Sequence, residues 1–279
     1  PENVLQVVPG AGDIGQAVSE HPGIDKIMFT GSTKTGQAIM RSAAADMKRV
    51  TLELGGNDAG IVLDDINVDT MAQDIFWGAF INTGQTCAAL KRLYVPASRY
   101  DELVQALAKI AAETPMGEGV SEENVLGPLQ NAAQQKIVAE LVEEARKGGA
   151  TIVTGGNPDD NQPGYFYPAT IVADIDQQNP LVQIEQFGPA LPIIKYDDLD
   201  QAIEWANELE VGLGSSVWSA NEDRAREVAN RLIAGTTWIN KHGAVDPRVP
   251  FGGVKKSGMG LEFGVEGLKQ VALPKVTSL

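Results

Sequence analysis

Residues 26–54 read KIMFTGSTKTGQAIMRSAAADMKRVTLEL, and this stretch decides the fold. Its two apolar ends, Lys26–Phe29 and Arg49–Leu54, are typical of buried strands, and Thr35–Asp46 between them has helical spacing. A crossover helix joins strands that run parallel in one sheet. Strands and helices alternate through most of the chain, so we expect an α/β protein with a mostly parallel sheet in three layers, helices covering both faces.

The expected elements form two sets. The strands are predicted at Val4–Val8, Lys26–Phe29, Arg49–Leu54, 60–65, 91–96, 151–156, 167–175, 191–196, 214–219 and 236–240. The helices are predicted at Ile14–Ser19, Thr35–Asp46, 68–84, Tyr100–Glu113, Asn131–Lys147, Leu199–Glu208 and Glu222–Ile233. The glycine-rich residues 250–270 are expected to be irregular, and Pro274 restricts residues 271–279 to an edge strand or an arm.

Composition excludes several classes of protein. The 279 residues carry a net charge of -15, which disfavours binding to nucleic acid. The single cysteine, Cys87, excludes an internal disulfide, and with only His21 and His242 beside it a Cys/His zinc site is not expected. The acidic clusters lack metal-ligand spacing, so we expect no metal. We find neither a membrane-length apolar run nor a secretory leader pattern, and therefore expect a cytoplasmic protein that does not bind membranes.

Two glycine-containing turns are candidates for binding a phosphate. Gly10, Gly12 and Gly15 spell G-x-G-x-x-G, but the acidic residue that the dinucleotide fingerprint needs about 20 positions later is replaced by Thr30 and Gly31. The second candidate is the strand-to-helix turn in MFTGSTKTGQAI, residues 28–39. Free backbone amides at that helix start could bind a phosphate, or Ser32 or Thr33 could simply cap the helix.

Cys87 and Glu53 are candidates for catalysis, each with a structural alternative. Cys87 follows the small and polar residues 82–86, whose backbone amides could lower its thiol pKa and hold an oxyanion; alternatively it is a buried small hydrophobe. Glu53 ends an apolar strand before Gly55 and Gly56. It is either a carboxylate that points to water or a desolvated one with a raised pKa, suited to general-base catalysis.

Five motifs in order and in spacing resemble the NAD(P)-dependent aldehyde dehydrogenases. They are FTGST (29–33), LELGGN (52–57), NTGQTC (82–87), EQFGP (185–189) and PFGGVKKSGMG (250–260). The resemblance implies that Cys87 attacks an aldehyde to form a thiohemiacetal and then a thioester. It implies that Glu53 activates the hydrolytic water. It implies contacts to NAD or NADP from Gly31, Ser32, Thr33, Lys34, Gly55, Glu185 and Phe187. Phe251 and residues 242–250 would border the aldehyde pocket, and Gly10 would lie near the adenine.

The resemblance also implies how the chain is organised. Residues 1–55 would be a remnant of a dinucleotide-binding domain, 56–256 a catalytic domain and 257–279 a C-terminal arm for oligomerisation. We expect a C-terminal portion of a longer enzyme, homo-oligomeric in its complete form, because the family's first cofactor-domain strands and second oxyanion donor have no counterpart here. Such a chain alone would be a poor dehydrogenase. The alternatives are a non-catalytic structural or interaction piece, and a weak cysteine esterase. Arg248 is either a surface residue or a contact to a carboxylate of the substrate.

Overall fold

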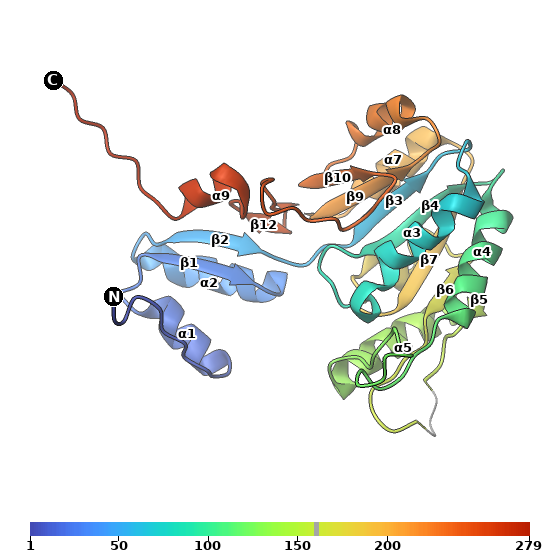
Figure 1. The fold of residues 1–279 in the computed structure, drawn as a ribbon, viewed down its shortest axis with the longest axis horizontal. Coiled ribbons are helices and arrows are strands. Elements are labelled where there is room, and N and C mark those ends of the chain that lie inside the picture. Colours follow the sequence, from blue (N-terminus) through green and yellow to red (C-terminus); the bar gives the residue numbers. More distant parts are fainter. Residues whose placement is uncertain (159–161) are drawn as a thin grey trace.

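The computed structural model describes residues 1–158 and 162–279, and its strands form two main sheets (Figure 1). Its strands are β1 (Lys26–Thr30), β2 (Arg49–Glu53), β3 (Asp58–Val62), β4 (Leu90–Pro96), β5 (Thr151–Thr154), β6 (Thr170–Ala173), β7 (Ala190–Tyr196), β8 (Val211–Gly212), β9 (Gly214–Trp218), β10 (Thr236–Ile239), β11 (Val254–Lys255) and β12 (Gly258–Met259). Its helices are α1 (Gly12–Glu20), α2 (Thr33–Ala45), α3 (Val68–Phe80), the 3-10 turn η1 (Ile81–Gly84), α4 (Tyr100–Glu113), α5 (Ala132–Lys147), α6 (Pro180–Gln183), α7 (Leu199–Glu208), α8 (Glu222–Ala229) and α9 (Gly264–Gln270).

The larger sheet has seven strands in the order β10-β9-β3-β4-β7-β6-β5. Every neighbouring pair runs parallel except β5 and β6, which are antiparallel at one edge. The central strand β4 is buried along its whole length, as expected of a parallel strand with helices on both sides. The α/β fold with its mostly parallel sheet is therefore confirmed.

Helices cover both faces of this sheet and create two cores. Helices α3 and α4 pack on one face, where Phe76, Phe80 and Leu107 meet Leu93 and Ile193 of the sheet. Helices α5, α7 and α8 pack on the other face against Ala59, Ile61 and Val217. Burial of each large apolar side chain contributes about 1.5–3 kcal/mol, so these two cores hold the carboxyl ends of the strands in fixed positions.

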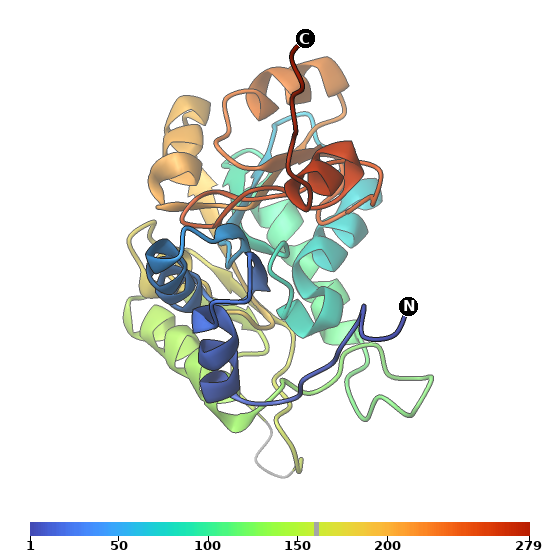
Figure 2. The same ribbon diagram turned by 90° about the vertical axis from the view of Figure 1, so that its left-hand side faces the viewer.

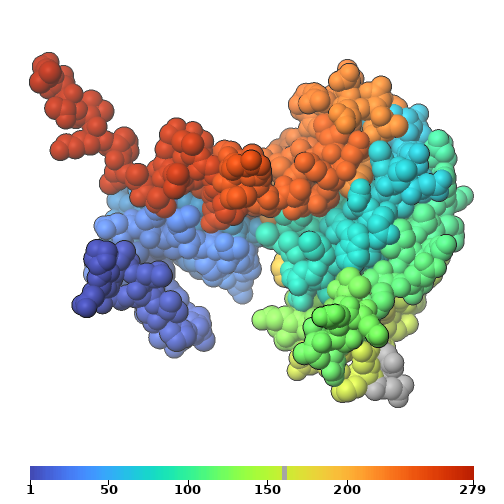
Figure 3. All heavy atoms as spheres, in the orientation of Figure 1, coloured from blue at the N-terminus to red at the C-terminus, as the bar shows by residue number. Residues whose placement is uncertain are grey.

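The smaller sheet joins the two ends of the chain. Strands β1 and β2 run parallel, and β12, from the C-terminal part, pairs antiparallel with β2. Helices α1 and α2 lie on one side of this sheet and α9 lies on the other (Figures 1 and 2). Below β2 a hollow separates α1 and α2 from the body of the larger sheet (Figure 3).

Several expected elements differ from the structure. Val4–Val8 is irregular and its apolar side chains are 65–86% exposed, because no described strand lies beside it to pair with. Residues 250–270, expected to be irregular, contain β11, β12 and α9; the two-residue strands are too short to show a hydrophobic period. Helix α8 ends at Ala229 instead of Ile233, and residues 271–279 form an exposed extension. Within the described ranges no helix is both long and apolar enough to cross a membrane.

Candidate active site

Glu53 is the last residue of β2. It lies at the junction between the two sheets, which is the segment 54–57 that links β2 to β3. The N–H of Gly31 donates to the Glu53 carbonyl oxygen at 3.0 Å, which fixes the backbone. The Glu53 residue is only 5% exposed, and neither carboxylate oxygen has a hydrogen-bond partner among the described residues. Burial, with a smaller contribution from the Glu262 carboxylate, raises the pKa of Glu53 to about 8. The alternative of a carboxylate in water is therefore wrong, and the predicted raised pKa is confirmed.

Cys87 lies after a strained turn at the end of α3. Asn82, Thr83 and Gly84 all have left-handed backbone angles, with φ of 50°, 55° and 71°. Two hydrogen bonds hold this turn: Thr83 Oγ1 donates to the Gly127 carbonyl at 3.1 Å and accepts from the Gly127 N–H at 3.2 Å. Left-handed non-glycine residues persist only where their surroundings hold them, and they concentrate at functional sites.

The Cys87 side chain is half-buried, and its thiol is not activated in the way that the sequence suggests. It packs with Ala88, Leu213 and Phe251. The Ala88 N–H does lower its pKa, as expected for a loop rich in amides, but burial is the larger effect. The net pKa of Cys87 is raised, with Asp58 and Glu185 adding to the rise. The expectation of a lowered thiol pKa is therefore wrong.

The loop that contains Phe251 and Gly252 joins the two candidate catalytic residues. Phe251 packs in the same apolar cluster as Cys87. A Cβ atom on Gly252 would lie 3.1 Å from Glu53 Oε1, so the backbone there passes directly beside the carboxylate. Ser257 fixes this loop to the junction, since its hydroxyl donates to the Gly55 carbonyl at 2.8 Å. Adjacent residues of one loop thus reach both Cys87 and Glu53.

Glu185 extends over the same junction from the loop before β7. The Gly56 N–H donates to Glu185 Oε1 at 3.3 Å, and a side chain at Gly55 would overlap the Glu185 carboxylate. Burial raises the pKa of Glu185 to about 7, although the nearby Lys91 ammonium opposes the rise. The Phe187 ring, two residues later, is half-buried. Glu185 therefore lies against Gly55 and Gly56, and Phe187 belongs to the same loop.

The turn between β1 and α2 presents backbone amides beside Glu53. Ser32 is the N-cap of α2, and its Oγ accepts the Thr35 N–H at 3.2 Å, so the capping alternative is confirmed. Capping does not exclude anion binding, because the first N–H groups of a helix have no partner within the helix. Gly31, Ser32 and Lys34 are exposed, and Thr33 Oγ1 donates to the Lys256 carbonyl at 3.2 Å.

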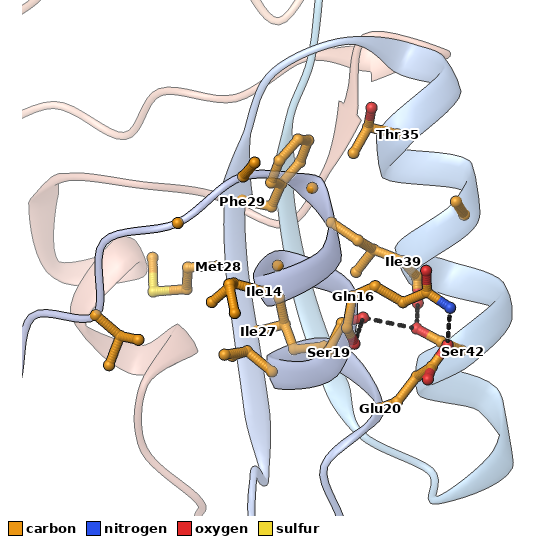
Figure 4. A pocket seen from close by; sticks show the side chains of 17 residues that line it. Ile14, Gln16, Ser19, Glu20, Ile27, Met28, Phe29, Thr35, Ile39 and Ser42 are labelled. Atoms are coloured by element: carbon orange, nitrogen blue, oxygen red, sulfur yellow. Dashed lines mark hydrogen bonds between the residues drawn. The ribbon is translucent and has the colours of Figure 1, made fainter.

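A pocket of about 710 Å³ opens between α1, β1 and α2 (Figure 4). Ile14, Ile27, Phe29 and Ile39 form apolar walls that suit a flat aromatic ring. Gly10, Gly12 and Gly15 also line it. No strand precedes these glycines, so they do not form the fingerprint turn; instead they lead into α1 and border this pocket.

Sequence reasoning missed a set of buried polar residues behind Cys87. Asp58 Oδ2 lies 3.5 Å from His242 Nε2, and both side chains are fully buried. His242 Nδ1 lies 2.9 Å from Ser216 Oγ, which already accepts the Trp218 indole N–H at 2.9 Å. The Ser216 hydroxyl therefore contacts both the Trp218 indole and the His242 imidazole, while His242 Nε2 faces Asp58.

Lys91, Arg248 and Phe251 differ widely in their exposure to solvent. Lys91 is 1% exposed, and a lysine inside the predicted apolar strand 91–96 was the sequence signal that could have revealed it. Arg248 has an 87% exposed side chain paired with Asp246 at 2.5 Å, in agreement with the surface alternative. Phe251 lines a hollow of about 510 Å³ with residues of the loop 241–250 and of α8.

Comparisons with known proteins identify the family of this chain. The aldehyde dehydrogenase family model matches residues 1–277. A geranial dehydrogenase of Castellaniella defragrans is 40% identical over 268 residues, which cover 96% of this chain and 56% of the relative.

Solved structures also match closely. An aldehyde dehydrogenase of Mycobacterium tuberculosis complexed with NAD+ has a TM-score of 0.94 at 37% identity, covering 100% of this chain and 59% of that one. An NAD+ complex of the Bacillus cereus enzyme has a TM-score of 0.91 at 39% identity, covering 94% of this chain and 54% of that one. The chain spans about half the length of these relatives, and it belongs to the aldehyde dehydrogenase family.

Proposed function

We propose that this chain carries the nucleophile and the general base of an NAD-dependent aldehyde dehydrogenase, which oxidises an aldehyde to a carboxylic acid. The observation that carries the proposal is that Phe251 packs with Cys87 while the next residue, Gly252, lies beside Glu53. Glu53 is buried, and its carboxylate has no hydrogen-bond partner among the described residues. A thiol nucleophile beside a desolvated carboxylate is the pair that acyl transfer to water needs.

Cys87 supplies the covalent step in this proposal. Its thiolate sulfur forms a bond to the aldehyde carbon, and the carbonyl π electrons move onto the oxygen. The Cys87 backbone N–H would then hold that negative oxygen as an oxyanion donor. Cys87 is half-buried and free of any disulfide, as a nucleophile must be.

A dinucleotide fits the residues that surround this pair. The apolar pocket beside α1 suits the adenine, the free amides at the start of α2 suit the pyrophosphate, and the Glu185 carboxylate suits ribose hydroxyls. When bound, NAD(P) supplies the two-electron oxidant that converts the cysteine adduct to a thioester. The chain's own part is to hold Glu185 against Gly55–Gly56, so that a ribose is oriented toward Cys87.

Glu53 completes the reaction as the base. Its carboxylate takes a proton from water, the water oxygen bonds to the thioester carbon, and the carbon–sulfur bond breaks with its electrons returning to Cys87. The products are a carboxylic acid and the regenerated thiolate. Because the pKa of Glu53 is about 8, this step is expected to accelerate as the pH rises through that value.

We propose the division into 1–55 for dinucleotide binding, 56–256 for catalysis and 257–279 as an arm that supports a homo-oligomer. The substrate is a small-molecule aldehyde, with NAD as the first coenzyme to test and NADP as the second. The cysteine esterase alternative shares Cys87 and Glu53, and would require no cofactor.

The experiment separates acylation from deacylation on the chain itself. The chain is mixed with the activated ester p-nitrophenyl acetate, and bound acetyl is followed by intact-protein mass spectrometry. We expect Cys87→Ala to take up no acetyl group, and Glu53→Gln to accumulate acetyl on Cys87 because the water step is lost. Ser98→Ala, an exposed hydroxyl at the other end of β4, is the control. Unchanged ester turnover in Cys87→Ala would overturn the assignment, and NADH formation from an aldehyde series then tests the oxidation.

A further inference from the structure

Residues 241–250 form a loop whose two ends contact the apolar cluster around Cys87. Trp238 precedes the loop and Phe251 follows it, and both belong to the cluster against which Cys87 packs. The backbone of the loop also passes close to the nucleophile candidate, because a Cβ atom on Gly243 would lie 3.1 Å from the carbonyl oxygen of the residue after Cys87. The position of this loop therefore affects how much space surrounds the thiol.

The His242 side chain anchors this loop in the protein interior. It is fully buried, whereas the other residues of the loop are exposed or half-buried. A Cβ atom on Gly78 of α3 would lie 2.9 Å from His242 Cβ, and the ring centres of His242 and Trp238 are 5.0 Å apart. The Trp238 indole N–H in turn donates to the Ala244 carbonyl at 2.9 Å. The imidazole thus fills a space between a helix and an aromatic residue of β10.

Two neighbouring strands supply polar contacts to the imidazole. Nδ1 of His242 lies 2.9 Å from Ser216 Oγ of β9, and Nε2 lies 3.5 Å from Asp58 Oδ2 of β3. Asp58 is 1% exposed, and its other oxygen, Oδ1, accepts the Gly214 N–H at 3.0 Å. Neither Asp58 Oδ2 nor His242 Nε2 has a hydrogen-bond partner among the described residues. A buried polar atom without a neighbour is costly, so the two groups favour one fixed position of the loop.

Asp58 also lies close to the backbone of Cys87. A Cβ atom on Gly56 would lie 2.6 Å from Asp58 Oδ1 and 3.1 Å from the Cys87 carbonyl oxygen. The carboxylate that faces His242 and the peptide of Cys87 therefore both lie against one glycine. Because protein interiors are close-packed, a displacement of the His242 imidazole is expected to change the surroundings of Cys87.

Open space borders the loop on one side. Trp238 and Phe251 line a hollow of about 510 Å³ together with Ala244, Val245 and Val249 of the loop. Loops with few buried contacts open at low free-energy cost, and this loop has a single fully buried side chain. Without that side chain, the loop has room to move into the hollow.

We propose that His242 is a positioning residue whose buried imidazole holds the loop 241–250 against β3 and β9, and so limits the size of the group that can reach Cys87. The inference rests on the proposed role of Cys87 as the nucleophile, and it adds a determinant of which aldehydes are accepted. His242 itself forms no bond in the reaction.

The test compares the labelling of Cys87 by two reagents that share a reactive group and differ in size, iodoacetamide and N-phenyl iodoacetamide. Because Cys87 is the only cysteine, both rates report on that thiol alone. Both reagents attack the same thiolate, so the ratio of their rates does not change with the thiol pKa. We expect His242→Ala to raise the relative rate of the bulky reagent about tenfold.

Two further variants separate positioning from a general loss of stability. His242→Gln fills a similar volume and retains hydrogen-bonding atoms, so it should restore the native ratio. Ser219→Ala is the matched control, because Ser219 is also fully buried and its hydroxyl donates to Asp65 at 2.7 Å just beyond the carboxyl end of β9. It should leave the ratio unchanged. An equal rise in Ser219→Ala, or an unchanged ratio in His242→Ala, would overturn the proposal.

A smaller change covers the case in which His242→Ala does not fold. Ser216→Ala removes only the oxygen that lies 2.9 Å from His242 Nδ1, and it should raise the ratio in the same direction by about threefold. An unchanged ratio in this variant contradicts the proposal. Because the labelling uses no aldehyde, ester or cofactor, these outcomes are independent of the proposed function, which fails instead if Cys87→Ala retains ester turnover.

Discussion

Glu53→Gln should stabilise the fold at alkaline pH while it removes the general base. The pKa of Glu53 rises from 4.5 to about 8 on folding, so the folded chain retains a proton that the unfolded chain releases. At 1.36 kcal/mol per pKa unit, this shift corresponds to about 5 kcal/mol of lost stability well above pH 8. Relaxation of the folded chain around the charge and entry of water to the carboxylate reduce the expected loss to about 2 kcal/mol.

The direction of the pH dependence follows from that proton. Between pH 4.5 and about 8 the native state binds more protons at Glu53 than the unfolded state does. The contribution of Glu53 to stability therefore falls as the pH rises through this window and levels off above it. Glutamine has the same shape as glutamate and does not ionise, so the stability of the Glu53→Gln variant should not fall in this pH window.

The assay is urea unfolding of the native chain and of Glu53→Gln at pH 5 and at pH 9. The slope of the unfolding free energy against urea concentration should be the same for both proteins, so that their stabilities can be compared. We expect the stability difference between variant and native chain to be about 2 kcal/mol more favourable at pH 9 than at pH 5. Glu227→Gln, on the exposed surface of α8, is the control and should show no such change. A difference that does not vary with pH would refute the argument that Glu53 is buried and protonated.

Three further predictions concern the junction and the cofactor residues. Gly84→Ala should destabilise the fold by about 2 kcal/mol in urea unfolding, because φ at Gly84 is +71° and the new methyl group would overlap the Gly188 carbonyl. Gly12→Ala is the control and should not destabilise the fold, because a Cβ atom there would have no neighbour within 4 Å. Gly55→Ala should displace the flexible Glu185 carboxylate, so calorimetry should show weaker NAD binding with little change in thermal stability. Ser32→Ala removes the cap of α2 and should cost about 1 kcal/mol; an unchanged melting temperature would contradict the capping role.

Local sequence patterns predicted most of the architecture. Helices α4 and α7 begin and end at the predicted residues, because amphipathic spacing and capping residues are local properties. Val4–Val8 shows the limit of this reasoning. Its apolar composition favours a strand, but a strand exists only where another one pairs with it, and pairing is decided by the rest of the chain.

The sequence by itself determined the residue types of the site: one cysteine after a polar turn, one glutamate before two glycines, and a glycine-rich loop far along the chain. Tertiary structure alone decided their chemical state. Burial raises the pKa of Glu53, outweighs the amide that favours the Cys87 thiolate, and places Lys91 between two loops that are about 100 residues apart. The reason is that desolvation and Coulomb interactions depend on distances through space, which the order of residues along the chain does not contain.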